Sequence, residues 1–322
     1  MSLFNGSFTA KQLRVTFTLT NSNAVFVGAN GAVLGNKLTL TGLRMIAVIR
    51  GAGFPSFPEA TLKIYGMTQG DMNALAVQTV SAGKTGWLPN TVLIEANSGN
   101  GWAAAFAGNI RTAGPDYSAI PNVPLVITAM NQSYTLINPA TPSSFPGSTS
   151  VFDIISVIAI KMGITAINNG VTISTSGPTY YPQASGEQLR AVCRAFNIDP
   201  VFDSDSNTTT VTVSPRGQAS FGASQILSPT TGLVGYPQPQ ANGFLSVRSL
   251  YNPAFRVKTP ITIEGSDVVI DATLTASTQL NSIANGNWVV TAITNTLEAF
   301  VPGGAWFSDM ILYPPNAPTV GT

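Results

Sequence analysis

Residues 12–19, QLRVTFTL, alternate strictly between apolar and polar side chains. In an extended segment Leu13, Val15, Phe17 and Leu19 fall on one face, and Arg14, Thr16 and Thr18 fall on the other. A period of two is typical of a half-buried β-strand. The pattern recurs along the chain in short segments that are separated by clusters of Gly, Pro and Asn, which form turns. We therefore predict a mainly β chain.

The predicted strands fall into two groups. The N-terminal group continues after residue 19 with the segments 37–49, 60–65, 91–96, 102–110 and 123–130. Residues 67–79, MTQGDMNALAVQT, are predicted to form a short helix within this group. The C-terminal group begins after residue 219 and consists of the segments 243–255, 260–265, 267–275, 286–300 and 305–313. Short strands with turn residues between them are typical of a β-barrel or sandwich.

A different pattern separates the two groups. In the apolar run 148–163, STSVFDIISVIAIKMG, the spacing i, i+3, i+4, i+7 predicts a helix over 151–162. Ser150 and Asp153 resemble a capping box with Asp in place of Glu, and Gly163 suits the position after the C-cap. The opposite face of this helix is also apolar, so we expect it to be buried on both faces.

A second helix with the same signals is predicted over 186–197, where Ser185 and Gln188 form the capping box. Strand candidates accompany the two helices at 171–176, 200–203 and 208–213.

The chain of 322 residues is long enough for several domains. We predict a first β domain at 1–138, a Pro/Ser-rich linker at 139–149, a small two-helix α/β domain at 150–217 and a second β domain at 218–322.

Composition excludes several classes of function. Charged residues make up 9% of the chain, against about 25% in ordinary soluble domains, and the net charge is +1. This leaves no basic patch for sequence-specific nucleic acid binding. Histidine is absent, which removes the commonest general base and the commonest metal ligand.

Other features bear on the compartment. The single Cys193 forms no internal disulfide, and residues 1–10 lack the features of a secretory signal. We therefore expect synthesis in a cytoplasm. The apolar core of the run, 151–162, is shorter than the roughly 20 residues that span a bilayer, so no membrane anchor is predicted.

Two motifs resemble ligand loops. Residues 81–86, SAGKTG, approach a phosphate-binding loop, but Gln78 stands where that motif needs glycine, so we favour an ordinary loop. Residues 203–207, DSDSN, match the start of a calcium loop, but Thr208 and Ser214 replace its Gly and Glu. We favour the tip of a hairpin here.

Acidic and aromatic residues leave an enzyme or a sugar-binding protein open as alternatives. A pair of carboxylates is enough to hydrolyse glycosides, but the available acids are scattered along the chain. They include Asp116, Glu187, Glu264, Asp267 and Glu298. The aromatic residues Trp288, Phe300, Trp306 and Phe307 gather in the last hairpin, where a core or a subunit interface is favoured over a sugar platform. We assign no catalytic, cofactor-binding or metal residue and no cofactor.

Three stretches carry a resemblance to a known family. They are 103–130 (AAAFAGNIRTAGPDYSAIPNVPLVITAM), 150–164 with 184–217, and 231–265 with 286–313. In this order the chain resembles the central baseplate hub proteins of contractile-tailed bacteriophages, the late-control D family, which is related to the hub half of type VI secretion spike proteins.

The resemblance implies two tail-tube-like β-barrel domains on either side of the two-helix α/β domain, and a structural role without catalysis. It implies a homotrimeric ring of pseudo-six-fold symmetry that joins the tail tube to the central spike in the virion baseplate. The implied partners are other copies of the chain, the spike protein, the tail tube or its initiator, and the baseplate wedge proteins. The protein would be made in the cytoplasm of the bacterial host. The alternative is a β-rich, tail-associated cell-wall hydrolase or carbohydrate-binding tail protein.

Overall fold

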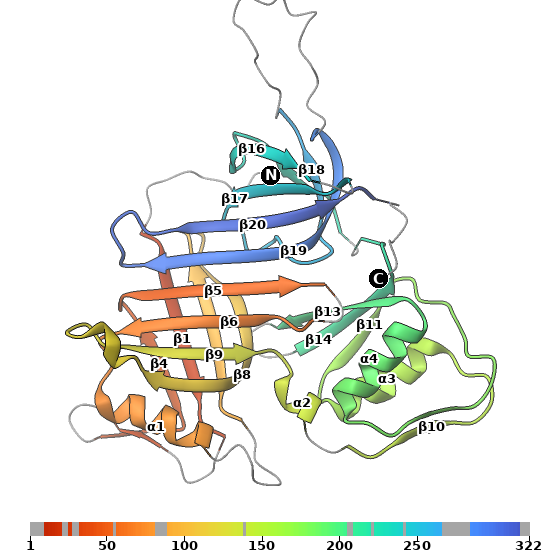
Figure 1. The fold of residues 1–322 in the computed structure, drawn as a ribbon, viewed down its shortest axis with the longest axis horizontal. Coiled ribbons are helices and arrows are strands. Elements are labelled where there is room, and N and C mark those ends of the chain that lie inside the picture. The colour runs from red at the N-terminus through yellow and green to blue at the C-terminus, as the bar shows by residue number, and fades with distance from the viewer. Residues whose placement is uncertain are drawn as a thin grey trace, which may run out of the picture.

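The computed structural model describes residues 10–20, 25–27, 32–53, 56–80, 89–137, 140–204, 209–219, 222–240, 243–265 and 284–315. These residues are mainly in β-strands with few helices, which confirms the mainly β prediction (Figure 1).

The first β region precedes residue 131 and holds nine strands among the described residues. They are β1 (Gln12–Thr18), β2 (Phe26–Val27), β3 (Val33–Gly35), β4 (Lys37–Thr41), β5 (Met45–Ala52), β6 (Glu59–Tyr65), β7 (Thr91–Asn97), β8 (Trp102–Pro115) and β9 (Pro124–Met130). Its helices are α1 (Gln69–Val80) and the 3-10 helix η1 (Tyr117–Ala119), and α2 (Ser133–Ile137) follows it.

The predicted strand 37–49 is in fact two strands. The chain turns at Gly42, whose φ of 71° lies in the left-handed region that glycine adopts readily. β4 therefore ends at Thr41, and β5 begins at Met45. The alternation of apolar residues continues on both sides of the turn, so periodicity alone did not reveal it.

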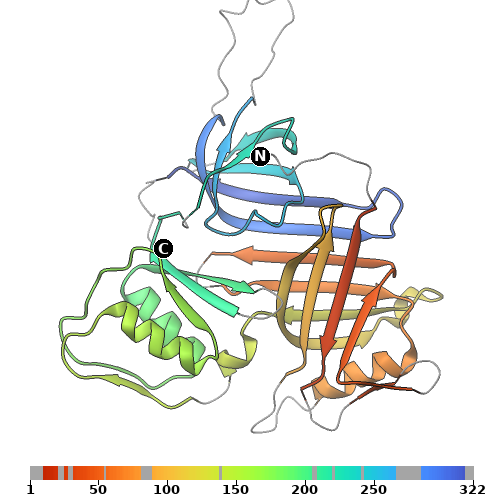
Figure 2. The same cartoon turned by 180° about the vertical axis from the view of Figure 1, so that it is seen from behind.

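The core of the first region lies between strands that cross one another. Figures 1 and 2 show β5, β6 and β9 running across β1 and β4, with α1 at one end. The alternate residues Leu13, Val15 and Phe17 of β1 are fully buried, as their period of two predicts. They pack with Leu62 and Ile127 from the crossing strands in one hydrophobic cluster.

The middle of the chain forms a three-stranded sheet that packs against two helices. The helices are α3 (Val151–Lys161) and α4 (Ser185–Ala195), and the sheet order is β11-β14-β13. The strands are β11 (Thr165–Asn168), β13 (Ile198–Ser204) and β14 (Thr209–Pro215), and a separate pair is formed by β10 (Ser143–Phe145) and β12 (Thr179–Tyr181).

One strand prediction for this part was wrong. Residues 171–176 form no strand but a single bridge, from Ser174 to Ser150. The predicted linker is structured in part, because residues 143–145 form β10 and Lys161 Nζ donates to the carbonyl oxygens of Thr141 and Pro142 at 2.9 and 3.1 Å.

The C-terminal cap of α3 follows the sequence, but the N-terminal caps do not. Gly163 has a φ of 71°, and the N–H groups of Gly163 and Ile164 donate to the carbonyls of Ile160 and Ala159, which is a Schellman motif. Neither Ser150 nor the residue before α4 makes a side-chain cap, so both predicted capping boxes were wrong. Gln188 is drawn away from that role, because its amide bonds to Ser143, Thr141 and Gln183.

The expectation that the helix at 151–162, α3, is buried on both faces was also wrong. Val151, Ile154, Ile155 and Ile158 are fully buried. Ile160, on the opposite face, is 75% exposed. The apolar character of Ile160 therefore does not reflect burial within the described chain.

The second β region runs from residue 225 to residue 313. Its described strands are β15 (Gln225–Leu227), β16 (Leu233–Pro239), β17 (Leu245–Leu250), β18 (Pro260–Ile263), β19 (Gly286–Ala299) and β20 (Trp306–Tyr313). The predicted strand 267–275 lies outside the described residues, and β15 and β16 were not predicted.

The two β regions share one 13-stranded sheet. Its main path is β16-β17-β20-β19-β5-β6-β9-β8-β7-β1-β4, and β15 and β18 join it beside β19. Among the described strands this path has two ends and no closed barrel, so the two-barrel layout is not confirmed. The domain boundaries given above remain predictions. No helix in the described part of the chain is long and apolar enough to span a membrane.

Candidate functional site

The described strands contain the same four-strand arrangement twice. In the first region the order is β5-β6-β9-β8, and in the second it is β16-β17-β20-β19. Each set consists of two antiparallel hairpins whose second strands pair with each other in the middle. We call the two sets the first and second repeat.

The long strand of each repeat strengthens the correspondence. β8 and β19 both have 14 residues, and both contain a register shift. Along one edge the first part of each pairs with an additional strand, β7 in one case and β18 in the other. No tandem repeat is visible in the amino-acid sequence, so the duplication is one of backbone topology.

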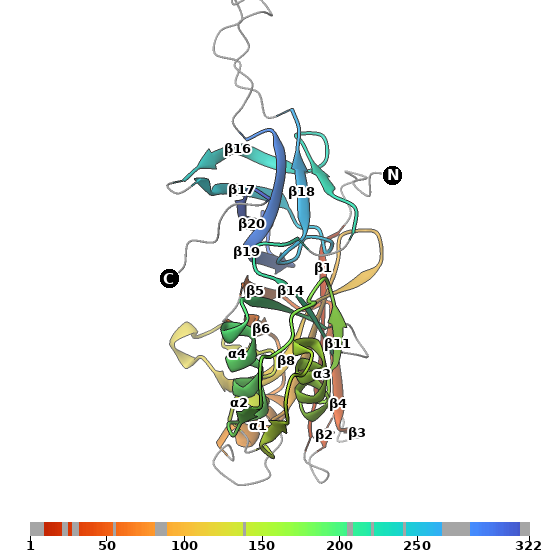
Figure 3. The same cartoon turned by 90° about the vertical axis from the view of Figure 1, so that its right-hand side faces the viewer.

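The repeats meet at an antiparallel seam between β5 and β19. Eight residue pairs join Met45–Ala52 to Ala292–Ala299, and neither stretch contains proline. Figures 1 and 3 show the two strands side by side at the centre of the molecule. Edge pairing over this length makes one continuous sheet from segments that are about 250 residues apart in the chain.

Apolar packing holds the second repeat to the core of the first. Trp306 of β20 is 2% exposed and lies edge-on to Tyr251, with ring centroids 5.9 Å apart. Its indole N–H donates to Ser98 Oγ at 2.8 Å. Trp306 and Tyr251 thus belong to the hydrophobic cluster of the first region.

The solvent face of the sheet carries few charges, and several of them are paired. Arg248 and Asp309 lie across β17 and β20 at 2.6 Å, and Arg50 and Glu59 lie across β5 and β6 at 3.8 Å. All four side chains are about half exposed, so each pair contributes at most about 1 kcal/mol to stability. This face therefore presents no concentrated field of either sign.

We call α3, α4 and the sheet β11-β14-β13 the helical segment. Charged side chains gather where this segment meets the second β region. We call this group the charged junction: Asp199, Asp203, Arg216, Arg256 and Lys258. Lys258 Nζ lies 2.5 Å from Asp199 Oδ2, and Arg216 Nε lies 3.5 Å from Asp199 Oδ1. The side chains of Lys258 and Asp199 are only 7% and 12% exposed.

Neutral groups complete the contacts of the buried lysine. Lys258 Nζ donates to the hydroxyl of Tyr313 at 3.1 Å, and that hydroxyl donates to the carbonyl of Gly217 at 3.1 Å. These two hydrogen bonds connect β20 to the end of β14. Because an ion buried without its partner is costly, this network favours one orientation of the helical segment.

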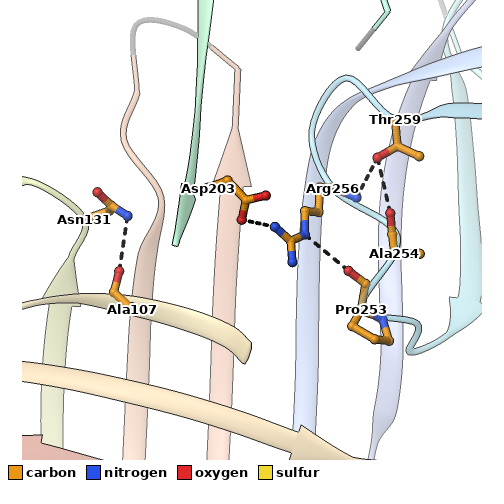
Figure 4. Close-up of polar contacts among 7 residues, drawn as sticks. All are labelled: Ala107, Asn131, Asp203, Pro253, Ala254, Arg256 and Thr259. Atoms are coloured by element: carbon orange, nitrogen blue, oxygen red, sulfur yellow. Dashed lines mark hydrogen bonds and ion pairs between the residues drawn. The ribbon is translucent and has the colours of Figure 1, made fainter. Parts of the chain in front are cut away.

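A second ion pair of the junction lies closer to solvent (Figure 4). Arg256 pairs with Asp203, and its Nε donates to the carbonyl of Pro253 at 3.3 Å. Thr259 Oγ1 accepts from the Arg256 N–H at 3.0 Å, which fixes the turn that presents the guanidinium. Desolvation lowers the pKa of Arg256.

An aromatic contact joins the helical segment to the first β region. Phe57, between β5 and β6, lies 4.7 Å from the ring of Phe202 on β13. The guanidinium of Arg190 from α4 lies 4.7 Å from the centre of the Phe57 ring. The helical segment is thus anchored to one β region by rings and to the other by charges.

A cleft remains where the three parts meet. A cavity of about 100 Å³, partly open to solvent, lies between β5, β8, β13 and the turn at 253–257. The buried hydroxyl of Tyr251 lines this cleft without a hydrogen-bond partner, and burial raises the pKa of Tyr251. Tyr251 therefore stays protonated at neutral pH and is no general base.

The two loop motifs have different outcomes. Residues 81–86 lie outside the described residues. Of the motif 203–207, Asp203 is described and pairs with Arg256, whereas residues 205–207 lie outside. β13 and β14 pair antiparallel on either side of it, as the hairpin interpretation predicts.

The structure places the scattered acids separately. Asp116 accepts from the N–H and hydroxyl of Ser118, and those hydrogen bonds lower its pKa. Glu187 pairs with Arg190 at 2.7 Å on α4, and Glu298 accepts from the N–H of Ala305. Glu264 is exposed beyond β18, and Asp267 lies outside the described residues. Within the described part, no group of three or more Cys, Asp or Glu side chains is placed to hold a metal ion.

The aromatic residues of the last hairpin do not share one face. Trp306 is buried and Phe300 is 52% exposed. Phe307 lies near Arg248, and Trp288 donates to the carbonyl of Ala284 near the other end of β19. Cys193 is fully buried in the helical segment, and burial raises its thiol pKa, so it is unreactive there.

Sequence reasoning missed the charged junction. In a chain this poor in charge, the cations Arg256 and Lys258 stand two residues apart in a turn, and the acids Asp199 and Asp203 stand four apart on one strand. Because side chains of a strand alternate, residues four apart share a face, and this spacing was the available signal.

Comparisons with known proteins agree with the arrangement of the strands. The model of a family described as baseplate hub gp41 matches residues 12–299. The chain belongs to this baseplate hub family. The resemblance drawn from the sequence is thereby confirmed, and the protein is a component of the bacteriophage tail baseplate.

Solved structures of tail proteins share the fold of this hub protein. The Escherichia coli c3393 protein, a type VI secretion component described as similar to the T4 tail proteins gp27 and gp5, has 9% identity and a TM-score of 0.57, over 84% of this chain and 73% of its own. A 43 kDa tail protein of prophage MuSo2 from Shewanella oneidensis has 10% identity and a TM-score of 0.56, over 95% of this chain and 98% of its own. A tail protein from Neisseria meningitidis MC58 has 7% identity and a TM-score of 0.55, over 95% and 97%. No curated protein sequence matches the chain.

Proposed function

We propose that this baseplate hub protein forms a homotrimeric ring that joins the six-fold tail tube to the three-fold central spike. The observation that carries the proposal is the duplicated four-strand arrangement, β5-β6-β9-β8 and β16-β17-β20-β19, in one chain. Three chains with two repeats each provide six similar positions around an axis while the ring keeps three-fold symmetry.

The seam between β5 and β19 supports the count of six similar positions. Because β5 and β19 pair over eight residues, neighbouring repeats within one chain have a fixed spacing and orientation. A closed ring needs such a junction six times, and the seam supplies three of them within chains. Closed cyclic symmetry also covers strand edges that a single copy leaves exposed.

The helical segment lies beside the sheet and outside the proposed ring. The charged junction and the Phe57–Phe202 contact hold it beside the sheet and away from the sheet's two ends (Figure 1). It can therefore lie outside a ring of repeats, where the exposed Ile160 of α3 is available to wedge proteins.

We propose a structural role without hydrolysis of the cell wall. The family and the similar structures are tail or tail-like proteins, and Asp116, Glu187 and Glu298 each have a separate local partner. Peptidoglycan turnover by purified protein that is lost when one carboxylate is replaced by its amide would overturn this part.

Native mass spectrometry of hub complexes released from purified tails tests the trimer. Each chain contributes 33.5 kDa. We expect three copies in each complex that retains the spike or tube protein, whereas two, six or twelve copies would contradict the ring.

A further inference from the structure

The duplicated arrangement indicates which strands would meet between copies. Within a chain, the first strand of the first repeat, β5, pairs with the long strand of the second, β19. The equivalent partners that remain are β16, the first strand of the second repeat, and β8, the long strand of the first. A ring with six similar junctions would therefore bring β16 of one copy to β8 of the next.

The required edge of β8 is free in the described chain. Residues Trp102–Asn109 pair with β7, and Asn109–Pro115 pair with β9 on the opposite edge. Ile110 N still donates to Asn90 O at 2.8 Å on the β7 side, so residues 111–115 are the part of β8 that has no described strand beside it on this edge. On β19 the equivalent stretch, Ala292–Ala299, is the one that pairs with β5.

The free edge of β16 differs from the equivalent edge of β5, which pairs with β19. Gln240 N donates to Phe244 O, so in this register Gln238 faces β17 and the backbone of Pro239 faces the free edge. Pro239 and Pro237 have no N–H to donate. The register shift between Val234 and Gln238 further interrupts the strand, and Gly235 has a φ of 72°.

Few donors therefore remain at this edge. The N–H of Leu233 is already used by Ser228 O at 2.9 Å. β8 also carries a proline, Pro115, in the stretch that would face β16, whereas the seam strands contain none. Proline and register shifts on edge strands prevent the formation of a regular ladder.

Arg111 supplies a donor of another kind. It lies in the register shift of β8, its side chain is exposed, and it has no ion pair or hydrogen bond within the described residues. The carbonyl group of Pro239, which faces this edge, is an acceptor for a guanidinium, which carries five N–H donors.

From these observations, and resting on the trimeric ring, we propose that the junction between copies joins β16 to residues 111–115 of β8 in a second copy. This junction is held by side chains such as Arg111 and by few backbone hydrogen bonds, unlike the seam within each chain. Free copies consequently do not extend one another's sheets, and the ring closes when tube or spike aligns them.

Cysteine cross-linking in purified tails tests the assignment. Thr112 and Gln238 are exposed on the solvent face of β8 and β16, and the chain's own Cys193 is buried. We expect tails that carry Thr112→Cys with Gln238→Cys to yield covalent dimers and trimers on mild oxidation. The matched control is Thr41→Cys with Gln238→Cys, which tests the other end of the sheet, β4.

Each outcome is informative. Cross-linking of the 112–238 pair alone supports the junction, and cross-linking of the 41–238 pair overturns it. Absence of both cross-links in tails that contain three copies of the chain refutes the junction and leaves the ring intact. Tails with another copy number refute the ring itself.

Replacing the prolines tests the blocked edge. Pro239→Thr with Pro237→Val restores two N–H groups, and we expect self-association of the free chain to strengthen roughly 30-fold in sedimentation velocity, since each backbone hydrogen bond contributes about fivefold. The control, Pro229→Thr with Pro302→Thr, removes two exposed turn prolines and is expected to leave association unchanged. A folded double variant that associates no more tightly than its parent would show that these prolines do not block the edge.

Discussion

The ion pair of Lys258 and Asp199 provides the sharpest test of how the helical segment is held. Replacing Asp199 with Asn leaves Lys258, 7% exposed, with the Tyr313 hydroxyl as its remaining polar contact among those described. Removing one partner of a buried pair typically costs about 3–5 kcal/mol, and we expect Asp199→Asn to fall in this range.

Lys258→Met should cost less, about 2–3 kcal/mol. In that variant Arg216, at 3.5 Å, still compensates the charge of Asp199. The double variant should cost less than the sum of the two singles, with a coupling energy of about 2 kcal/mol, because it leaves neither ion unpaired.

Urea unfolding of the three variants measures these differences, and hydrogen exchange of residues 198–204 and 253–259 shows where stability is lost. The control is Glu59→Gln, which breaks the exposed pair with Arg50 and should change stability by less than about 0.5 kcal/mol. If Asp199→Asn were as mild as this control, the charged junction would not position the helical segment.

Three further predictions concern single side chains. Ile155→Asp places a charge in a fully buried position and should lower the free energy of urea unfolding by several kcal/mol. Ile160→Asp, at a 75% exposed position on the same helix, should lower it by less than about 1 kcal/mol. Similar losses in the two variants would contradict the observed burial. Trp306→Ala should cost about 3–5 kcal/mol and increase hydrogen exchange at the seam, and retention of the parent's protection there would show that Trp306 does not hold the repeats together. Burial raises the pKa of Tyr251, so the folded state keeps this proton when the unfolded chain loses it, and stability should fall as the pH rises above about 10. Tyr251→Phe should reduce this alkaline loss and be nearly neutral at pH 7, because the hydroxyl has no partner; an unchanged alkaline slope would refute the assignment.

Local periodicity predicted many of the strands but little of their arrangement. β1 could be predicted because its inward side chains are all buried by the crossing strands of the same region. The turn within segment 37–49 could not be predicted, because apolar and polar residues continue to alternate on both sides of Gly42. The duplicated repeats are invisible in the sequence, since pairing order depends on contacts between segments up to about 250 residues apart.

The same limit applies to caps and to burial. Gln188 has the right spacing for a capping box, but the nearby segment 141–143 offers its amide better-placed partners. Ile160 is apolar yet exposed. An apolar residue is expected to be buried, but the sequence does not show whether the same chain or another molecule covers it. The junction charges were likewise unpredictable as pairs, because β13 and the turn at 253–259 meet only in the folded chain.

The most direct test of the central claim is symmetry-resolved electron cryo-microscopy of the intact tail. We predict three copies of this chain on the tail axis, between tube and spike, with six similar four-strand repeats around the channel. Six or twelve copies, or density for this chain at the fibres instead of on the axis, would contradict it.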